Sequence, residues 1–186
     1  MEVTDIQSIM KRKNLTSMHC PTARALGTVG EWWSLLILRD VIQGINRFGE
    51  LRSSLDISTN SLSRRLKEMT ESGLLKREAY QHQPTRYEYH PTDKGRDLYP
   101  VIVMLFEWGK QHMFEKGSAP EIKLVNSELE DLTPVIVDAK SGNTIDSLNS
   151  TIEANVDATT ATLRRIKLVR ERTGKKISRG DELWKE

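Results

Sequence analysis

The feature that most constrains the fold of this chain is a change in hydrophobic period at Gly73. From residue 58 to residue 72, apolar side chains recur every three or four residues, which predicts an amphipathic helix. After Gly73 the pattern alternates with a period of two, over 75–80 and again over 86–90. Two such runs around a short turn predict a β-hairpin. A helix followed directly by a hairpin is the pattern of a helix with a wing beside it.

The predicted helix 58–72 has one apolar face and one polar face. Leu62, Leu66 and Met69 share the apolar face, and no acid precedes Glu68. The amides, hydroxyls and cations of the polar face are groups that contact the base edges and phosphates of DNA. The candidates for base edges, with Thr59 beside them, are Asn60, Ser61 and Arg64. The candidates for phosphates are Ser63, Arg65 and Lys67.

Helix 58–72 is preceded by a second helix, as in a helix-turn-helix. Phe48, Leu51 and Leu55 predict a short amphipathic helix over 47–55, and a turn at residues 56–57 follows it. A helix-turn-helix joins two helices by a short turn and leaves the outer face of the second one exposed. Residues 47–72 therefore fit this motif.

Two further helices are predicted upstream. Proline is favoured at the first position of a helix, so Pro21 begins a short helix over 21–28, which Gly30 ends. Residues 32–43 are apolar on nearly all sides, which predicts a buried helix.

The predicted wing, about 74–90, carries polar and basic side chains at its tip. His82, Gln83 and Arg86 lie in or beside the turn Q-H-Q-P-T. Such a tip suits the phosphate backbone or the minor groove of DNA. We therefore predict that these three residues contact DNA.

After the wing, Thr92 is expected to cap a helix over about 93–113. Its apolar stripe has little left to pack on in a domain of this size, so part of it is expected to pack on a second copy of the chain. The alternative is that the stripe belongs to the core of the same chain. The predicted dimerisation residues are Leu98, Val101, Ile102, Leu105, Phe106 and Trp108.

The composition predicts a soluble, cytoplasmic protein that is not an enzyme. Of 186 residues, 37% are hydrophobic, but no run approaches the roughly 20 apolar residues of a membrane span. The N-terminus lacks the apolar core of a signal peptide. Cys20 is the only cysteine, and no nucleotide-binding, hydrolase or zinc-protease motif occurs. The four histidines lack metal-ligand spacing, so we expect neither a metal nor another cofactor.

Several motifs follow one another between Cys20 and Met113. They are C-P, G-E-W-W-S-L-L-I-L-R-D, G-I-N-R-F-G-E-L, L-S-R-R-L, G-L-L-K-R, P-T-R-Y-E-Y, T-D-K-G and W-G. The ordered set resembles the HxlR-type winged helix-turn-helix regulators, relatives of the MarR group. The resemblance implies a mainly α fold with a small β wing, and a sequence-specific transcriptional regulator, expected to be a repressor. It also implies a homodimer on a pseudo-palindromic double-stranded operator, with helix 93–113 paired with the first helix and arm of the partner.

The resemblance also implies roles for individual residues. Asn60, Ser61 and Arg64 fall at the base-reading positions, which vary between members because operators vary. Arg65 falls at a basic position usual in the family. It lies beside the core face, so it is expected to bond either a phosphate or an acid of its own domain. The target genes, the inducing signal and a small-molecule effector are not identified by the sequence.

The patterns predict three parts of the chain: an arm over 1–19, a DNA-binding and dimerisation domain over 20–117, and an extension over 118–186. The extension resembles the tail of one branch of the family, without the paired cysteines that some relatives carry there. It is expected to form a small β-hairpin unit over about 120–146 and a basic helix over about 151–176.

The charge of the extension is uneven. Residues 115–161 carry a net charge of −6 and residues 162–180 a net charge of +7. Three roles of the basic helix stay open: contact with DNA that flanks the operator, packing across the dimer, or a solvated face.

Cys20 precedes Pro21, so its sulfur is expected at a helix N-terminus. Backbone N–H groups and the helix dipole favour a thiolate there, and His19 and Arg24 are close in sequence. Two interpretations stay open. Cys20 senses oxidants, as a cysteine at this position does in some members of the resembled family, or it is a small buried residue at the start of a helix.

One other class of function stays open. A winged helix can serve as a protein-interaction module that does not read DNA, but such a surface is expected to show apolar anchors. The outer face of residues 58–67 shows Asn, Ser, Arg and Lys instead. We therefore predict sequence-specific DNA binding, with the interaction module as the alternative.

Overall fold

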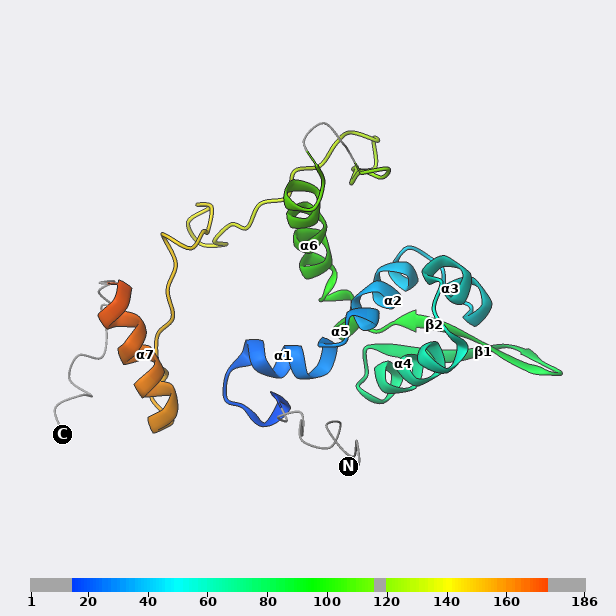
Figure 1. Ribbon diagram of the computed structural model, residues 1–186, viewed down its shortest axis with the longest axis horizontal. Coiled ribbons are helices and arrows are strands. Elements are labelled where there is room, and N and C mark those ends of the chain that lie inside the picture. The colour runs from blue at the N-terminus through cyan, green and yellow to red at the C-terminus, as the bar shows by residue number, and fades with distance from the viewer. Residues whose placement is uncertain (1–14, 116–119, 174–186) are drawn as a thin grey trace, which may run out of the picture. The chain divides into compact units, whose positions relative to one another are not determined.

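The computed structural model describes residues 15–115 and 120–173 of the chain. The chain divides into two compact units, residues 1–134 and 135–186. In the described part of the first unit, helices lie around the base of a two-stranded sheet, and the turn of the sheet projects beyond them (Figure 1). This confirms the predicted mainly α fold with a small β wing. Most of the predicted arm lies outside the described residues, and Leu15–Ser17 form a short 3-10 helix, η1.

Within the described residues, four α-helices precede the sheet, and their bounds agree closely with the predicted ones. They are α1 (Pro21–Val29), α2 (Trp32–Ile42), α3 (Phe48–Leu55) and α4 (Thr59–Glu71). The expected start signals are present. Pro21 lies in the first turn of α1, and the Ser58 side chain accepts a hydrogen bond from the Ser61 N–H at 3.3 Å, which caps α4.

The predicted wing is the antiparallel pair β1 (Leu75–His82) and β2 (Thr85–Pro91). Both strands are longer than predicted, and the register runs from Leu75 opposite Pro91 to His82 opposite Thr85. Pro91 is the last residue of the second strand. A proline is tolerated here because each strand of a two-stranded sheet is an edge strand.

The core of the first unit lies where α2, α3, α4 and the base of the wing meet. Its most deeply buried side chains are Ile37, Leu38, Leu51, Leu62, Leu66, Met69, Leu74 and Leu75. The prediction that the α2 segment is buried on nearly all sides is wrong, since Trp32 is 76% exposed and Leu36 is 36% exposed. The apolar run could not show that α2 lies at the edge of the core.

The helix predicted over 93–113 is two helices, α5 (Asp93–Arg96) and α6 (Tyr99–His112). Thr92 caps the first, as predicted, because its side chain accepts a hydrogen bond from the Gly95 N–H at 3.1 Å. Pro100 lacks the N–H that a continuous helix would bond to the preceding turn. The chain therefore begins a new helix, with Pro100 in its first turn.

Within the β-hairpin unit predicted over about 120–146, the runs 122–125 and 133–138 do not pair with each other. Each run folds back on the residues that follow it, with a single bridge from Val125 to Asp131 and another from Val137 to Thr144. Polar side chains cause this. Asn126 Oδ1 accepts hydrogen bonds from two backbone N–H groups of its turn, and Asp138 does the same in the second turn.

The second unit contains one helix within its described residues, α7 (Thr160–Thr173). It begins later than the predicted position near residue 151, because Thr159 Oγ1 accepts a hydrogen bond from the Thr162 N–H at 3.3 Å and caps the helix there. Residues 174–176 of the predicted helix lie outside the described residues. Of the helices in the described ranges, none combines the length and apolarity needed to cross a membrane.

Candidate nucleic-acid interface

The core fixes which face of α4 points outward. Leu62, Leu66 and Met69 are at most 2% exposed, so the apolar face of α4 is packed inside. Ser61 is half-buried and accepts a hydrogen bond from the Ser58 hydroxyl at 3.0 Å. The other predicted contact residues of the outward face are all exposed: Thr59, Asn60, Ser63, Arg64 and Lys67.

The two exposed cations of this face are available for a ligand. Lys67 Nζ lies 3.8 Å from Glu71 Oε1, and both side chains are more than half exposed. Such loose surface pairs contribute little and open readily. Within residues 15–115 and 120–173, the Arg64 side chain forms neither a hydrogen bond nor an ion pair. An exposed guanidinium near the N-terminus of a capped helix suits a base edge or a phosphate.

Arg65 differs from its neighbours, because it is only 7% exposed. Its guanidinium NH2 lies 3.2 Å from Glu31 Oε2, at the start of α2, and NH1 pairs with Glu68 one turn along α4. Of the two partners expected for Arg65, the structure shows acids of its own domain. The pair with Glu31 holds α4 against α2, and Arg65 Nε is buried without a hydrogen-bond partner among the described residues. A phosphate contact of Arg65 stays a prediction.

The wing is fastened to the start of α3 by a pairing that the sequence analysis missed. Arg47 and Glu88 form an isolated β-bridge, and Arg47 Nε donates to Glu88 Oε1 at 2.8 Å. This hydrogen bond raises the pKa of Arg47 above its ordinary value. The guanidinium also lies 4.5 Å from the centre of the Tyr80 ring. The only local signal was Glu50 three residues after Arg47, and Glu50 Oε2 accepts from the Arg47 N–H at 3.2 Å.

The tip of the wing presents the predicted side chains to solvent. His82, Gln83 and Arg86 are exposed. Gln81 Nε2 donates to the Gln83 carbonyl at 2.9 Å, and Thr85 Oγ1 donates to the His82 carbonyl at 3.2 Å. These bonds fix the turn, so the three contact candidates project from a defined backbone.

No metal site emerges from the described part of the chain, where no three His, Cys, Asp or Glu side chains gather as a metal would require. His82 pairs with Thr85 at the tip of the wing, whereas His90 pairs with Lys76 near its base. His90 Nε2 lies 3.6 Å from Glu88 and 3.7 Å from Glu78. The register thus separates the two histidines that flank the wing turn.

The apolar stripe of α6 divides into two parts. Leu98 and Ile102 pack against the core of their own chain. Val101, Leu105 and Trp108 are 50%, 52% and 52% exposed. Their spacing of four and three residues places these three side chains on one face of the helix. The intrachain alternative thus holds for Leu98 and Ile102, and packing on a second copy stays a prediction for the exposed part of the stripe.

Cys20 occupies the N-cap position of α1 and is half-buried. Its thiol is not in a disulfide. Arg24 Nε donates to the Met18 carbonyl at 2.5 Å, so this cation is held by the backbone just before Cys20. The predicted position at a helix N-terminus is confirmed, whereas a sensor role stays a prediction.

Known proteins share this architecture. The model of the HxlR-like helix-turn-helix family matches residues 28–117. The chain is 40% identical over 131 residues to Rv3095 of Mycobacterium tuberculosis, an uncharacterized HTH-type transcriptional regulator, and the match covers 70% of this chain and 82% of that protein. It is 36% identical over 94 residues to an uncharacterized HTH-type transcriptional regulator of Methanothermobacter thermautotrophicus, covering 50% of this chain and 72% of that protein.

Two solved structures are similar over most of this chain. PA1607, assigned as a transcription factor, is 30% identical with a TM-score of 0.69, and the match covers 75% of this chain and 98% of that one. PA1374 from Pseudomonas aeruginosa, assigned likewise, is 39% identical with a TM-score of 0.56, covering 78% and 99%.

Proposed function

The chain belongs to the HxlR-like helix-turn-helix family of transcriptional regulators, and on that basis we propose that it binds a specific DNA operator as a homodimer and represses transcription. One observation carries the proposal. The first turns of α4 expose Asn60, Ser63 and Arg64, while the opposite face of the helix is fixed in the core. A dimer seated on an operator within a promoter excludes polymerase, so repression is the expected output.

The exposed residues divide by chemistry. Arg64 suits a bidentate contact to guanine, and Asn60 suits one to adenine. Lys67 and Ser63 lie on the same face and suit phosphates, which position the protein without reading sequence. The wing tip, with Arg86 foremost, suits the adjacent backbone or minor groove.

A homodimer is supported by the exposed half of the α6 stripe. Val101, Leu105 and Trp108 each leave about half of their surface in solvent in a single chain. Exposed apolar side chains gathered on one helix face are typical of a protein–protein interface. In a two-fold dimer the two copies of α4 would enter successive major grooves about 34 Å apart.

The test of the function is a gel shift with DNA from upstream of the protein's own gene, against random DNA of equal length. The same protein is used to select binding sites from a random library, so that a distant operator is also found. Enrichment of an inverted repeat with half-sites one helical turn apart is the expected result. A library that returns no preferred sequence would contradict the proposal and leave the interaction module.

We further propose that oxidation of Cys20 lowers operator affinity. Two Cys20 thiols of a dimer would lose two electrons to diamide, which is reduced to the hydrazine, and would form one intersubunit disulfide. The expected result is a gel shift that diamide weakens and dithiothreitol restores. A Cys20→Ser variant that loses affinity to the same extent on treatment with diamide would overturn this role.

A further inference from the structure

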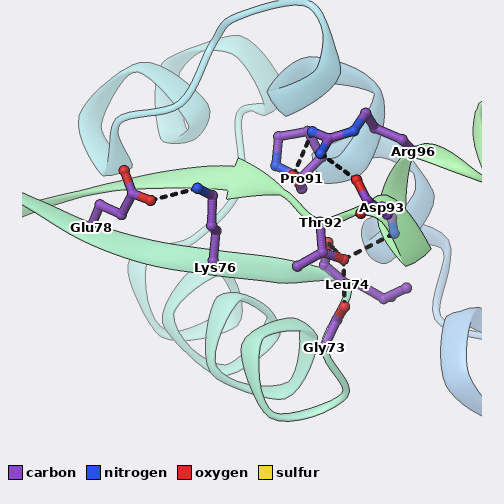
Figure 2. Close-up of polar contacts among 9 residues, drawn as sticks. Gly73, Leu74, Lys76, Glu78, Pro91, Thr92, Asp93 and Arg96 are labelled. Atoms are coloured by element: carbon purple, nitrogen blue, oxygen red, sulfur yellow. Dashed lines mark hydrogen bonds and ion pairs between the residues drawn. The ribbon is translucent and has the colours of Figure 1, made fainter.

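Three consecutive backbone carbonyls follow the end of α4, and all of them accept hydrogen bonds from Thr92, which caps α5, and Lys94, in its first turn. Lys94 Nζ donates to the Ser72 carbonyl at 2.6 Å. The Thr92 hydroxyl donates to the Gly73 carbonyl at 2.6 Å, and the Thr92 N–H donates to the Leu74 carbonyl at 3.1 Å. Figure 2 shows the Thr92 side chain beside Gly73 and Leu74, where the chain leaves α4. We call these contacts the Thr92 joint.

The carbonyls at the end of α4 need these donors because the chain turns out of the helix at Gly73. Gly73 adopts a φ of +71°, a conformation that favours glycine, and the Leu74 N–H donates back to the Met69 carbonyl at 2.9 Å. This ends the helix and turns the next carbonyls away from it. Leu74 itself is buried, at 1% exposed. A carbonyl left unpaired beside a buried residue is costly, so the donors of the Thr92 joint stabilise this exit.

On its α5 side, the Thr92 joint is closely packed around Gly95. The Thr92 hydroxyl accepts from the Gly95 N–H at 3.1 Å, so one oxygen both donates and accepts. Gly95 is buried, and a Cβ there would overlap the Leu74 carbonyl oxygen. Only glycine lets the first turn of α5 approach β1 so closely.

The path continues from the joint into α6. The Leu98 N–H donates to the Gly95 carbonyl at 3.1 Å, and the Leu98 carbonyl accepts from the first turn of α6. Leu98 also packs against the core. An unbroken series of hydrogen bonds and packing contacts therefore runs from the end of α4, through Thr92 and Gly95, to α6.

We propose that the Thr92 joint fixes the angle between α4 and α6, and that Thr92 is its positioning residue. The inference rests on the proposed function, because in a dimer paired through α6 this angle sets the separation of the two copies of α4. A two-fold dimer binds half-sites at one spacing. A loosened joint therefore lowers operator affinity and weakens the preference for one half-site spacing, although no DNA-contacting residue changes.

The test compares Thr92→Val with Thr92→Ser. Serine keeps a hydroxyl that donates and accepts, whereas valine keeps the volume and loses both functions. Spin labels are placed at Glu71→Cys on α4 and Gln111→Cys on α6, both exposed, in a Cys20→Ser background. Labelled chains are diluted with unlabelled ones, and the distance within one chain is measured by pulsed electron paramagnetic resonance. A narrow distribution is expected for Thr92 and Thr92→Ser, and a broadened or shifted one for Thr92→Val.

In parallel, operator and random DNA are titrated with each variant. Thr92→Val is expected to lower the ratio of operator affinity to random-DNA affinity by about tenfold, with the affinity for random DNA unchanged. Thr92→Ser is expected to keep the ratio of the parent. If the distance distribution of Thr92→Val superimposes on that of the parent, the proposal that the Thr92 joint fixes the angle between α4 and α6 is wrong. This readout needs neither DNA nor a dimer, so it separates failure of the joint from failure of the proposed function.

Circular dichroism shows whether Thr92→Val folds. If it does not fold, a second variant, Lys94→Ala, tests the Thr92 joint. Lys94 is exposed and reaches the joint only through its ammonium group, so Lys94→Ala is expected to fold. It should broaden the same distance distribution to a smaller extent. If Thr92→Val does not fold, this variant decides alone, and an unchanged distribution in it would overturn the proposal.

Discussion

Two helices of this chain share a four-residue pattern in the same order. Arg-Arg-Leu-Lys occupies 64–67 in α4, and Arg-Arg-Ile-Lys occupies 164–167 in α7. The apolar residue is buried in both, with Leu66 at 1% and Ile166 at 2% exposed. The second arginine differs. Arg65 is buried and paired with two acids, whereas Arg165 is exposed.

The difference shows that local sequence sets the period of a helix but not the partners of its side chains. Arg65 is buried because α4 lies across the start of α2, where Glu31 lies within reach. Charge alone would rank α7 as the better DNA-binding helix, since it carries more cations than α4. Position favours α4 instead, because α4 is the second helix of a helix-turn-helix and stands beside a wing.

The largest expected effect comes from Arg65. Arg65→Ala removes the guanidinium that pairs with Glu31 and Glu68, and we expect a loss of about 2 kcal/mol in the free energy of unfolding. This lies below the usual cost for a buried pair because the Glu31 and Glu68 side chains are 29% and 47% exposed. The matched Arg165→Ala should change stability by at most about 0.5 kcal/mol. Urea unfolding followed by circular dichroism measures both, and equal losses would refute the comparison.

Arg64 and Arg164 come next, because both are exposed and only Arg64 is proposed to read a base. Arg64→Ala should cost about 1–3 kcal/mol of discrimination at one base pair of each half-site. Arg164→Ala should leave the selected sequence unchanged. Selection from a random DNA library with both variants measures these preferences. An unaltered consensus sequence for Arg64→Ala would show that Arg64 does not read a base.

The smallest effect concerns Lys67 and Lys167. Lys67→Ala should weaken operator and random DNA alike and make the salt dependence of log affinity shallower by about 1 per chain. Lys167→Ala should leave the slope unchanged if α7 is a solvated face. A shallower slope in Lys167→Ala as well would show that α7 contacts DNA, which would settle one of the roles left open for it. Affinities measured at several salt concentrations distinguish these results.

Most of the first unit could be predicted from sequence because its signals are local. The periods of α4 and the wing, the Ser58 cap and the Pro21 start each depend on a few adjacent residues. The continuous helix over 93–113 was wrong for a local reason that was visible, since Pro100 interrupts it. Within the β-hairpin unit the sequence could not show which residues pair, because alternation does not identify the partner of a run and Asn126 accepts hydrogen bonds within its own turn.

The sequence could predict which side chains of the candidate site are exposed, but not the tertiary contacts that hold the site in place. The exposure of Asn60, Ser63 and Arg64 follows from the angular position of each residue around α4. The bond from Arg47 to Glu88 joins residues 41 positions apart, and the acids that hold Arg65 depend on how α2 and α4 cross. Such contacts come from tertiary packing, and no pattern in one sequence specifies them.

The Thr92 joint also determines how the wing can vary. The bond from Thr92 to the Gly73 carbonyl joins residues 19 apart, so the hairpin is a loop closed at its base. The entropy of closing such a loop rises slowly with its length. Residues can therefore be inserted or removed at the tip, around Gln83 and Pro84, with little effect on the seating of α4. The wing tip is thus an exchangeable module in which DNA preference can diverge while the rest of the domain is retained.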